Sequence, residues 1–198
     1  DPEGKPRELD PSREEIRFTT FTQSGRDEGG NGIDGDQICR ATGELERALD
    51  ALIAGNIGHP ARELMWGAPG TLLAALFLVD RTGNERWADL FRLTASTLWR
   101  QLEWSPQRLC SYWTQDLYGR QSAYLGAVHG FVATALPLIR GRRLLDAESW
   151  KAWERCIVDT VQCTADRLGA HANWRALLGI PRDDGTRLPQ FCHRAPGV

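Results

Sequence analysis

Residues 126–138 read GAVHGFVATALPL, and residues 66–78 read WGAPGTLLAALFL. In both stretches a short glycine-rich run leads into a segment that is apolar at almost every position. A helix that is apolar on every side must be buried on every side. The two stretches therefore predict two inner helices, which directly follow Gly70 and Gly130. Glycine at these points lets the preceding loop turn tightly.

Helices of a second kind follow the inner ones along the chain. We place the inner helices at residues 71–79 and 131–139, and each precedes a segment, 85–102 or 147–168, that mixes charged and apolar residues at helical spacing. Such spacing predicts a helix with one wet face. Inner and outer helices that alternate with a period of about 60 residues form the repeat unit of an α/α toroid. A plain helical bundle stays open as the alternative.

The two ends of the chain differ from its middle. Residues 1–36 are rich in glycine, proline and charge, so we expect a mostly irregular segment there. Residues 38–54 show helical spacing and open the ordered part. We therefore expect a single all-α domain over residues 37–198.

Composition excludes several classes of protein. A net charge of −2 gives no reason to expect nucleic acid as a partner. The longest apolar run, TLLAALFLV, is shorter than the roughly 20 residues that cross a bilayer, so we expect no transmembrane segment. The five cysteines are odd in number and widely spaced, which favours reduced thiols and a cytoplasmic location.

The candidate functional residues all occur in loops that lead into predicted inner helices. They are Glu63, His129 and Cys192, with His193 directly after the cysteine. If the inner helices line one cavity, these loops meet at one rim and bring a carboxylate, an imidazole and a thiol together. Histidine can transfer a proton near neutral pH, and a cysteine thiolate binds Zn²⁺. Taken singly, each residue could also be a packing or capping residue.

In chain order these loops resemble the lanthionine synthetase C-like (LanC-like) family. The resemblance rests on ELMWGAPGTLLAALFL, WTQDLYGRQSAYLGAVHGFVATALPLIRG and NWRALLGIPRDDGTRLPQFCHRAPGV. GAVHG is similar to the family's GAxHG motif, and FCHRAPG to its WCHGAPG motif. The similarity covers roughly residues 63–198, about two thirds of the chain.

The resemblance implies a toroid of seven inner and seven outer helices around a Zn²⁺ ion held by two cysteines and one histidine. Family members add cysteine or glutathione thiols to dehydroalanine or dehydrobutyrine residues of peptides. Carried over to this sequence, Cys192 matches a zinc ligand, and His129 matches the histidine proposed for proton transfer. Glu63 stands where the family has an acidic residue before its first glycine motif.

The sequence departs from the family pattern near the proposed metal ligand. Phe191 and Arg194 replace a tryptophan and a glycine, Arg187 is offset from a family arginine, and the second Cys-His motif has no counterpart. We therefore expect a fragment with about half of the toroid, which by itself is inactive and binds zinc poorly. The parent protein could also lie at a membrane surface.

Two other functions stay open at this stage. One is a non-catalytic binding or scaffold protein on the same fold. The other is a glycosidase-like α/α barrel, which would need a second acid opposite Glu63, and Asp116 is the residue to test.

Overall fold

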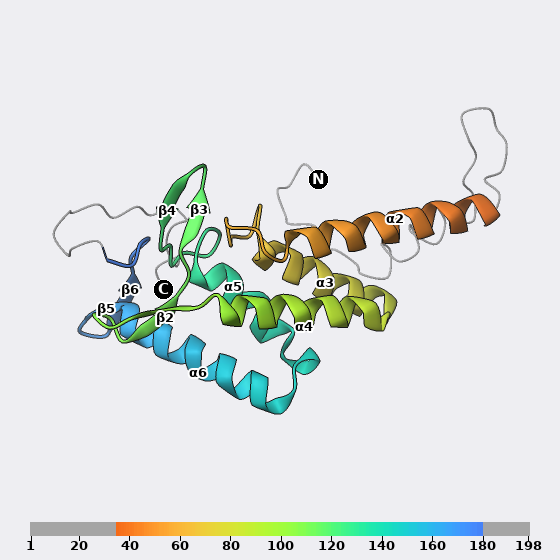
Figure 1. Cartoon of the computed structure of the whole chain (residues 1–198). Coiled ribbons are helices and arrows are strands. Elements are labelled where there is room, and N and C mark those ends of the chain that lie inside the picture. The colour runs from red at the N-terminus through yellow and green to blue at the C-terminus, as the bar shows by residue number, and fades with distance from the viewer. Residues whose placement is uncertain (1–34, 180–198) are drawn as a thin grey trace, which may run out of the picture. The chain divides into compact units, whose positions relative to one another are not determined.

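The computed structural model describes residues 35–179, and predictions for residues 1–34 and 180–198 lie outside that range (Figure 1). About 56% of the described residues are helical. The chain divides into two units, Asp1–Ala48 and Leu49–Val198, and the described site residues belong to the second. The helices are α2 (Gly35–Asn56), α3 (Ala68–Thr82), α4 (Glu85–Arg100), α5 (Phe131–Arg140) and α6 (Ala147–Thr164), with a 3₁₀ turn η1 (Arg142–Leu144).

Five predicted helical segments are confirmed, each with small shifts at its ends. The outer helices begin at side-chain caps, since Asn84 Oδ1 accepts the Arg86 N–H at 3.0 Å and Asp146 Oδ1 accepts the Ser149 N–H at 2.8 Å. Gly83, with φ of 65°, ends α3 in the left-handed conformation that glycine adopts without strain. The predicted helix over 147–168 is wrong in its last four residues, which form a strand.

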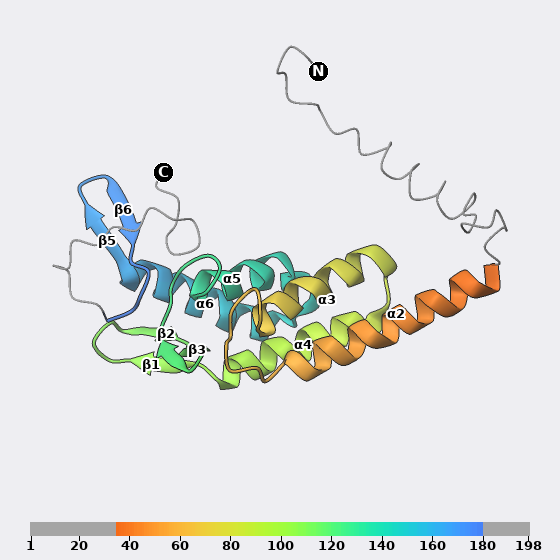
Figure 2. The ribbon, with the colours of Figure 1, turned by 90° about the horizontal axis from the view of Figure 1, so that it is seen from above.

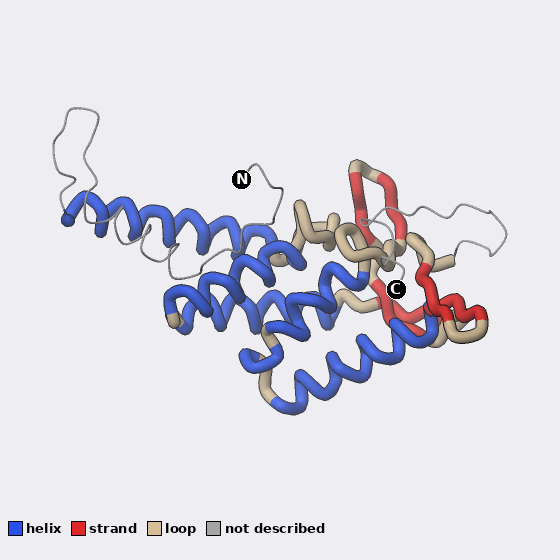
Figure 3. Tube along the Cα trace, turned by 180° about the vertical axis from the view of Figure 1, so that it is seen from behind, coloured by secondary structure: helices blue, strands red, loops and turns tan. Residues whose placement is uncertain are grey.

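Within residues 35–179 three short antiparallel hairpins interrupt the helical order, which argues against the predicted pure all-α fold. Figure 3 shows these strands in red next to the ends of the blue helices. Their strands have three or four residues each, too few for alternation to stand out in the sequence. They pair as β1 (Glu103–Ser105) with β2 (Cys110–Tyr112), β3 (Gln115–Leu117) with β4 (Arg120–Ser122), and β5 (Ala165–Leu168) with β6 (His171–Trp174).

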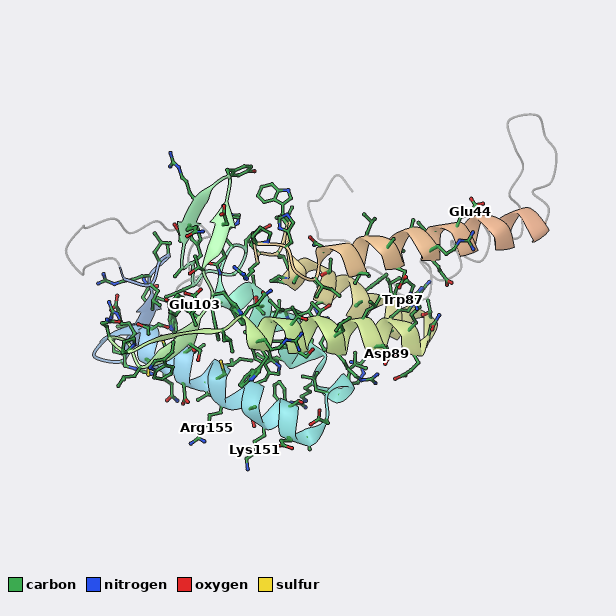
Figure 4. The ribbon with its side chains drawn as sticks, in the orientation of Figure 1. Glu44, Trp87, Asp89, Glu103, Lys151 and Arg155 are labelled. Atoms are coloured by element: carbon green, nitrogen blue, oxygen red, sulfur yellow. The ribbon has the colours of Figure 1, made fainter. Side chains whose placement is uncertain are left out.

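The core of the second unit lies where α3, α4, α5 and α6 pack against one another and against the first hairpin (Figure 2). Its largest buried side chains come from the four helices and from the residue after β2, and include Leu72, Trp87, Phe91, Leu98, Trp113, Phe131, Leu138 and Trp153. The rings of Trp113 and Phe131 stack at 5.2 Å, which joins the segment directly after the first hairpin to α5. Lys151 and Arg155 point outward from α6, as predicted for a helix with one wet face (Figure 4).

The predicted inner helices α3 and α5 pack against each other, but they are not buried on every side. Phe77 on α3 is 64% exposed, and Val132, Leu136 and Ile139 on α5 are also exposed. The described elements cover one side of each helix and leave an apolar stripe uncovered. The prediction of burial on all sides is therefore wrong for the described residues. No described helix has the length and apolarity that a membrane span requires.

Candidate functional site

Two loops of the same shape lead into α3 and α5. Each ends in a glycine that caps the helix, Gly67 with φ of −130° and Gly130 with φ of −127°. The Gly67 N–H donates to the Glu63 carbonyl at 2.9 Å, and the Gly130 N–H donates to the Gly126 carbonyl at 3.1 Å. The structural repeat therefore pairs Gly130 with Gly67. The sequence prediction paired it with Gly70, which lies inside the first turn of α3.

Both capping glycines are required by close approach of the backbone. A Cβ atom on Gly67 would lie 2.4 Å from the Glu63 nitrogen, and one on Gly130 would lie 2.4 Å from the Tyr124 carbonyl carbon. Distances this short to backbone atoms cannot be relieved by moving a side chain. Each loop thus folds back on itself immediately before its helix, which brings the preceding side chains close to the helix start.

Backbone and side-chain bonds join the two loops. The Leu64 N–H donates to the Val128 carbonyl at 2.9 Å. Beside this bond, Glu63 Oε2 lies 3.1 Å from His129 Nδ1, and Glu63 Oε1 accepts the Trp66 backbone N–H. The structure therefore brings together two of the three residues that the sequence selected, Glu63 and His129, one from each loop.

The surroundings of this pair determine what it can do. Glu63 is fully buried, whereas the His129 side chain is 22% exposed, so the imidazole stands between the carboxylate and the surface. An ionised carboxylate only accepts hydrogen bonds, so the contact assigns the proton to Nδ1. The proton-accepting nitrogen of that tautomer is Nε2. A carboxylate that orients an imidazole in this way is the arrangement found in general acid–base sites.

Further residues that the sequence analysis did not select support the histidine loop. Gln115 is fully buried on β3, and its Oε1 accepts the Tyr124 N–H at 2.7 Å. The Tyr124 ring in turn lies 6.1 Å from the His129 ring. Glutamine is ordinarily a surface residue, so no pattern marked this one as a support.

Metal ligands are the part of the predicted site that the structure does not address. Cys192, His193 and Arg187 lie outside the described residues. Within residues 35–179 no three His, Cys, Asp or Glu side chains form a group that could hold a metal ion. The predicted zinc ligand Cys192 is not among these residues, and within residues 35–179 no other set of side chains takes its place.

Buried thiols do not supply a nucleophile either. Burial raises the pKa of Cys110 to about 11, and it also raises the pKa of Cys156. Because the thiolate is the reactive form, both side chains are inert near neutral pH. They serve as small packing groups between β2 and α6.

Asp116, the second acid of the glycosidase alternative, has a local structural role. Its Oδ1 accepts the Gly119 N–H at 2.9 Å and so closes the turn between β3 and β4. Its backbone N–H donates to the Pro60 carbonyl at 3.0 Å, which ties this hairpin to the loop that carries Glu63. No observation favours paired carboxylate chemistry here.

A groove of about 570 Å³ lies between α4 and α6, away from the predicted site residues. Trp99 and Trp153 form its apolar wall, with ring centroids 4.8 Å apart, and Arg100 and Glu148 lie at its polar edge. Size alone would favour this groove as a binding site. The Glu63–His129 pair is the better candidate for catalysis, because the groove lacks a buried ionisable group.

Comparisons with protein-family models, with curated proteins and with solved structures find no match for this chain. The resemblance to the LanC-like family therefore rests on the sequence motifs alone.

Proposed function

We propose that the Glu63–His129 pair is a proton-transfer site in a protein that adds thiols to dehydroalanine or dehydrobutyrine residues of peptides. The observation that carries the proposal is the 3.1 Å contact between Glu63 Oε2 and His129 Nδ1, with the carboxylate buried and the imidazole partly exposed. His129 transfers the proton, and Glu63 is a positioning residue. Two of the three stretches behind the resemblance supply the loops that meet, and the motif around Cys192 lies outside the described residues.

The proton has a defined route in this reaction. As the thiol sulfur bonds to Cβ of the dehydrated residue, the electron pair of the Cα–Cβ double bond moves onto Cα and the adjoining carbonyl. The proton lost by the thiol passes to Nε2 of His129 and is then delivered to Cα. Positioned proton transfer of this kind contributes about 10²-fold or more to a rate. Glu63 stabilises the imidazolium that forms in between.

The finer features of the proposal rest on the sequence. An α/α toroid is supported by the alternation of α3 and α5 with α4 and α6. Zn²⁺ is proposed only through Cys192, with the remaining ligands not identified. A dehydrated peptide and either a second cysteine or glutathione are the proposed partners, in the cytoplasm, where unpaired cysteines stay reduced.

The sequence predicts that this chain alone is inactive in the zinc-dependent reaction, so the experiment tests only proton delivery and uses a thiol that needs no metal. An aryl thiol, which is ionised at neutral pH, is added to a dehydroalanine peptide in the presence of the full chain, and the product is analysed by chiral chromatography. Because the thiolate brings no proton, His129 takes from water the proton that it delivers to Cα. Uncatalysed addition gives both configurations at Cα. A histidine that delivers the proton from one side gives an excess of one configuration.

We expect wild-type protein to give that excess and His129→Asn to lose it. Glu63→Gln should reduce it, because the amide holds the imidazole less firmly. His171→Asn is the control, since His171 lies on β6 outside the two loops, and it should behave as wild type. A product with both configurations in equal amounts from wild type and His129→Asn alike would refute the role of His129.

A further inference from the structure

Two exposed aromatic side chains lie beside the Glu63–His129 pair. Tyr118, between β3 and β4, is 84% exposed, and Trp66, before α3, is 48% exposed. Their ring centroids are 5.3 Å apart with planes at 73°, an edge-to-face arrangement. Residues of this size normally gain stability by burial, and aromatic residues left on the surface are enriched at binding interfaces.

Tyr118 also holds an unfavourable backbone conformation. Its φ is 56° and that of Gly119 is 76°, so the two residues form the kind of hairpin turn that favours asparagine, aspartate and glycine. A bulky residue with positive φ is uncommon and costs stability. Folding therefore gives no reason to place tyrosine at this tip, whereas a binding function does.

Bonds of the backbone fix this aromatic pair relative to the site. The Trp66 N–H donates to Glu63, the carboxylate that contacts His129. The hairpin that carries Tyr118 is tied to the same loop through the bond between Asp116 and Pro60. Both rings are thus carried by segments that are bonded to the loop of Glu63.

A positive charge marks one edge of the hairpin. Arg120 pairs in register with Leu117 directly across the turn, and it is exposed. Within the described part of the chain no hydrogen bond or ion pair engages its guanidinium. A cation on the hairpin that carries Tyr118 complements a ligand with a large apolar group and a nearby negative charge.

We propose that Trp66 and Tyr118 form a docking platform for a large apolar side chain of a peptide, with an adjacent acidic residue of that peptide bound by Arg120. The Asp116 carboxylate at the same turn accepts the Gly119 N–H, which leaves Arg120 as the charge available to a ligand. Two rings and one available cation suit one side chain with one carboxylate better than an anionic membrane. The inference rests on the proposed function only in identifying this peptide as the substrate whose dehydrated residue reaches His129.

The test is a binding measurement with the full chain and a fluorescein-labelled peptide, Gly-Ser-Phe-Glu-Ser-Gly, followed by fluorescence anisotropy. Tyr118→Ala and Trp66→Ala should each weaken binding at least fivefold, and so should replacing the phenylalanine of the peptide by alanine. Arg120→Glu should weaken binding of this peptide and strengthen binding of the version with lysine in place of glutamate.

Matched controls come from the first hairpin region. Leu109, 63% exposed with φ of 54°, matches Tyr118, and Trp104, 58% exposed, matches Trp66. Leu109→Ala and Trp104→Ala should keep the affinity within twofold. Wild-type affinity in Tyr118→Ala, or an equal loss in the two controls, would overturn the proposal. Because Tyr118 is so exposed, its variant tests binding even if Trp66→Ala disturbs the loop.

The probe contains no dehydrated residue, so binding is measured without thiol addition. Loss of product stereochemistry with intact peptide binding would reject the role of His129 alone. Intact stereochemistry with no effect of Tyr118→Ala would reject the platform alone.

Discussion

The loops before α3 and α5 follow the same backbone path and carry different side chains. Counting back from the capping glycine, Trp66 occupies the position of His129, and Glu63 occupies the position of Gly126. The fold requires the glycine and the turn, so the other positions are available for function. The Glu63–His129 contact takes one residue from each loop, so the site depends on both copies of the repeated loop.

Substitution of the capping glycines tests the shared path and should give the largest effect. Gly67→Ala and Gly130→Ala each place a Cβ 2.4 Å from backbone atoms. We expect each to lower the free energy of unfolding by more than about 2 kcal/mol, measured by urea denaturation. Gly58→Ala, whose Cβ would meet nothing within 4 Å, should change it by less than about 0.5 kcal/mol. Equal effects at all three positions would contradict the proposed backbone path.

Removal of the carboxylate tests the contact between the loops. Glu63→Ala leaves the Trp66 N–H and His129 Nδ1 without their acceptor, and we expect a loss of about 2–3 kcal/mol in the free energy of unfolding. Glu63→Gln retains an acceptor and should lose less. Glu44→Ala, at an exposed position of α2, is the surface control and should be neutral. A neutral Glu63→Ala would mean that the loops do not depend on this contact.

Substitutions in the two hairpin turns should change the free energy of unfolding by a smaller amount and should raise it. Leu109 and Tyr118 both have positive φ, so Leu109→Gly and Tyr118→Gly should each raise the free energy of unfolding by about 0.5–1 kcal/mol. Thermal denaturation measures this gain. Only Tyr118→Gly should also lose affinity for the peptide probe. A gain in stability without that loss would leave the strain at Tyr118 without a functional reason.

Sequence patterns predicted the helices well and the repeat register less well. The apolar runs placed α3 and α5 correctly, but they suggested that α3 starts after Gly70. Pro69 already lies in its first turn, where proline is favoured, and this signal points to Gly67 as the cap. The hairpins were missed because strands of three or four residues leave no clear alternation.

The site was partly predictable for a similar reason. Glu63 and His129 precede successive predicted inner helices, and the expectation that their loops meet was conditional on those helices lining one cavity. In the structure their side chains lie 3.1 Å apart. Gln115 and the Trp66–Tyr118 contact depend on how the second hairpin folds against the loops. Such contacts between distant segments leave no local pattern in the sequence.

The tautomer of His129 depends on its contact with Glu63, and His59 in the neighbouring segment serves as an internal reference. Glu63 Oε2 accepts a hydrogen bond from His129, so Nδ1 of His129 must carry a proton. In His59 the Nδ1 atom accepts the Ala61 N–H at 3.2 Å, so the proton of its neutral ring must be on Nε2. Long-range ¹H–¹⁵N NMR distinguishes the two forms. We predict the Nδ1–H tautomer for neutral His129 and the Nε2–H tautomer for His59. An Nε2–H tautomer at His129 would contradict the pairing with Glu63.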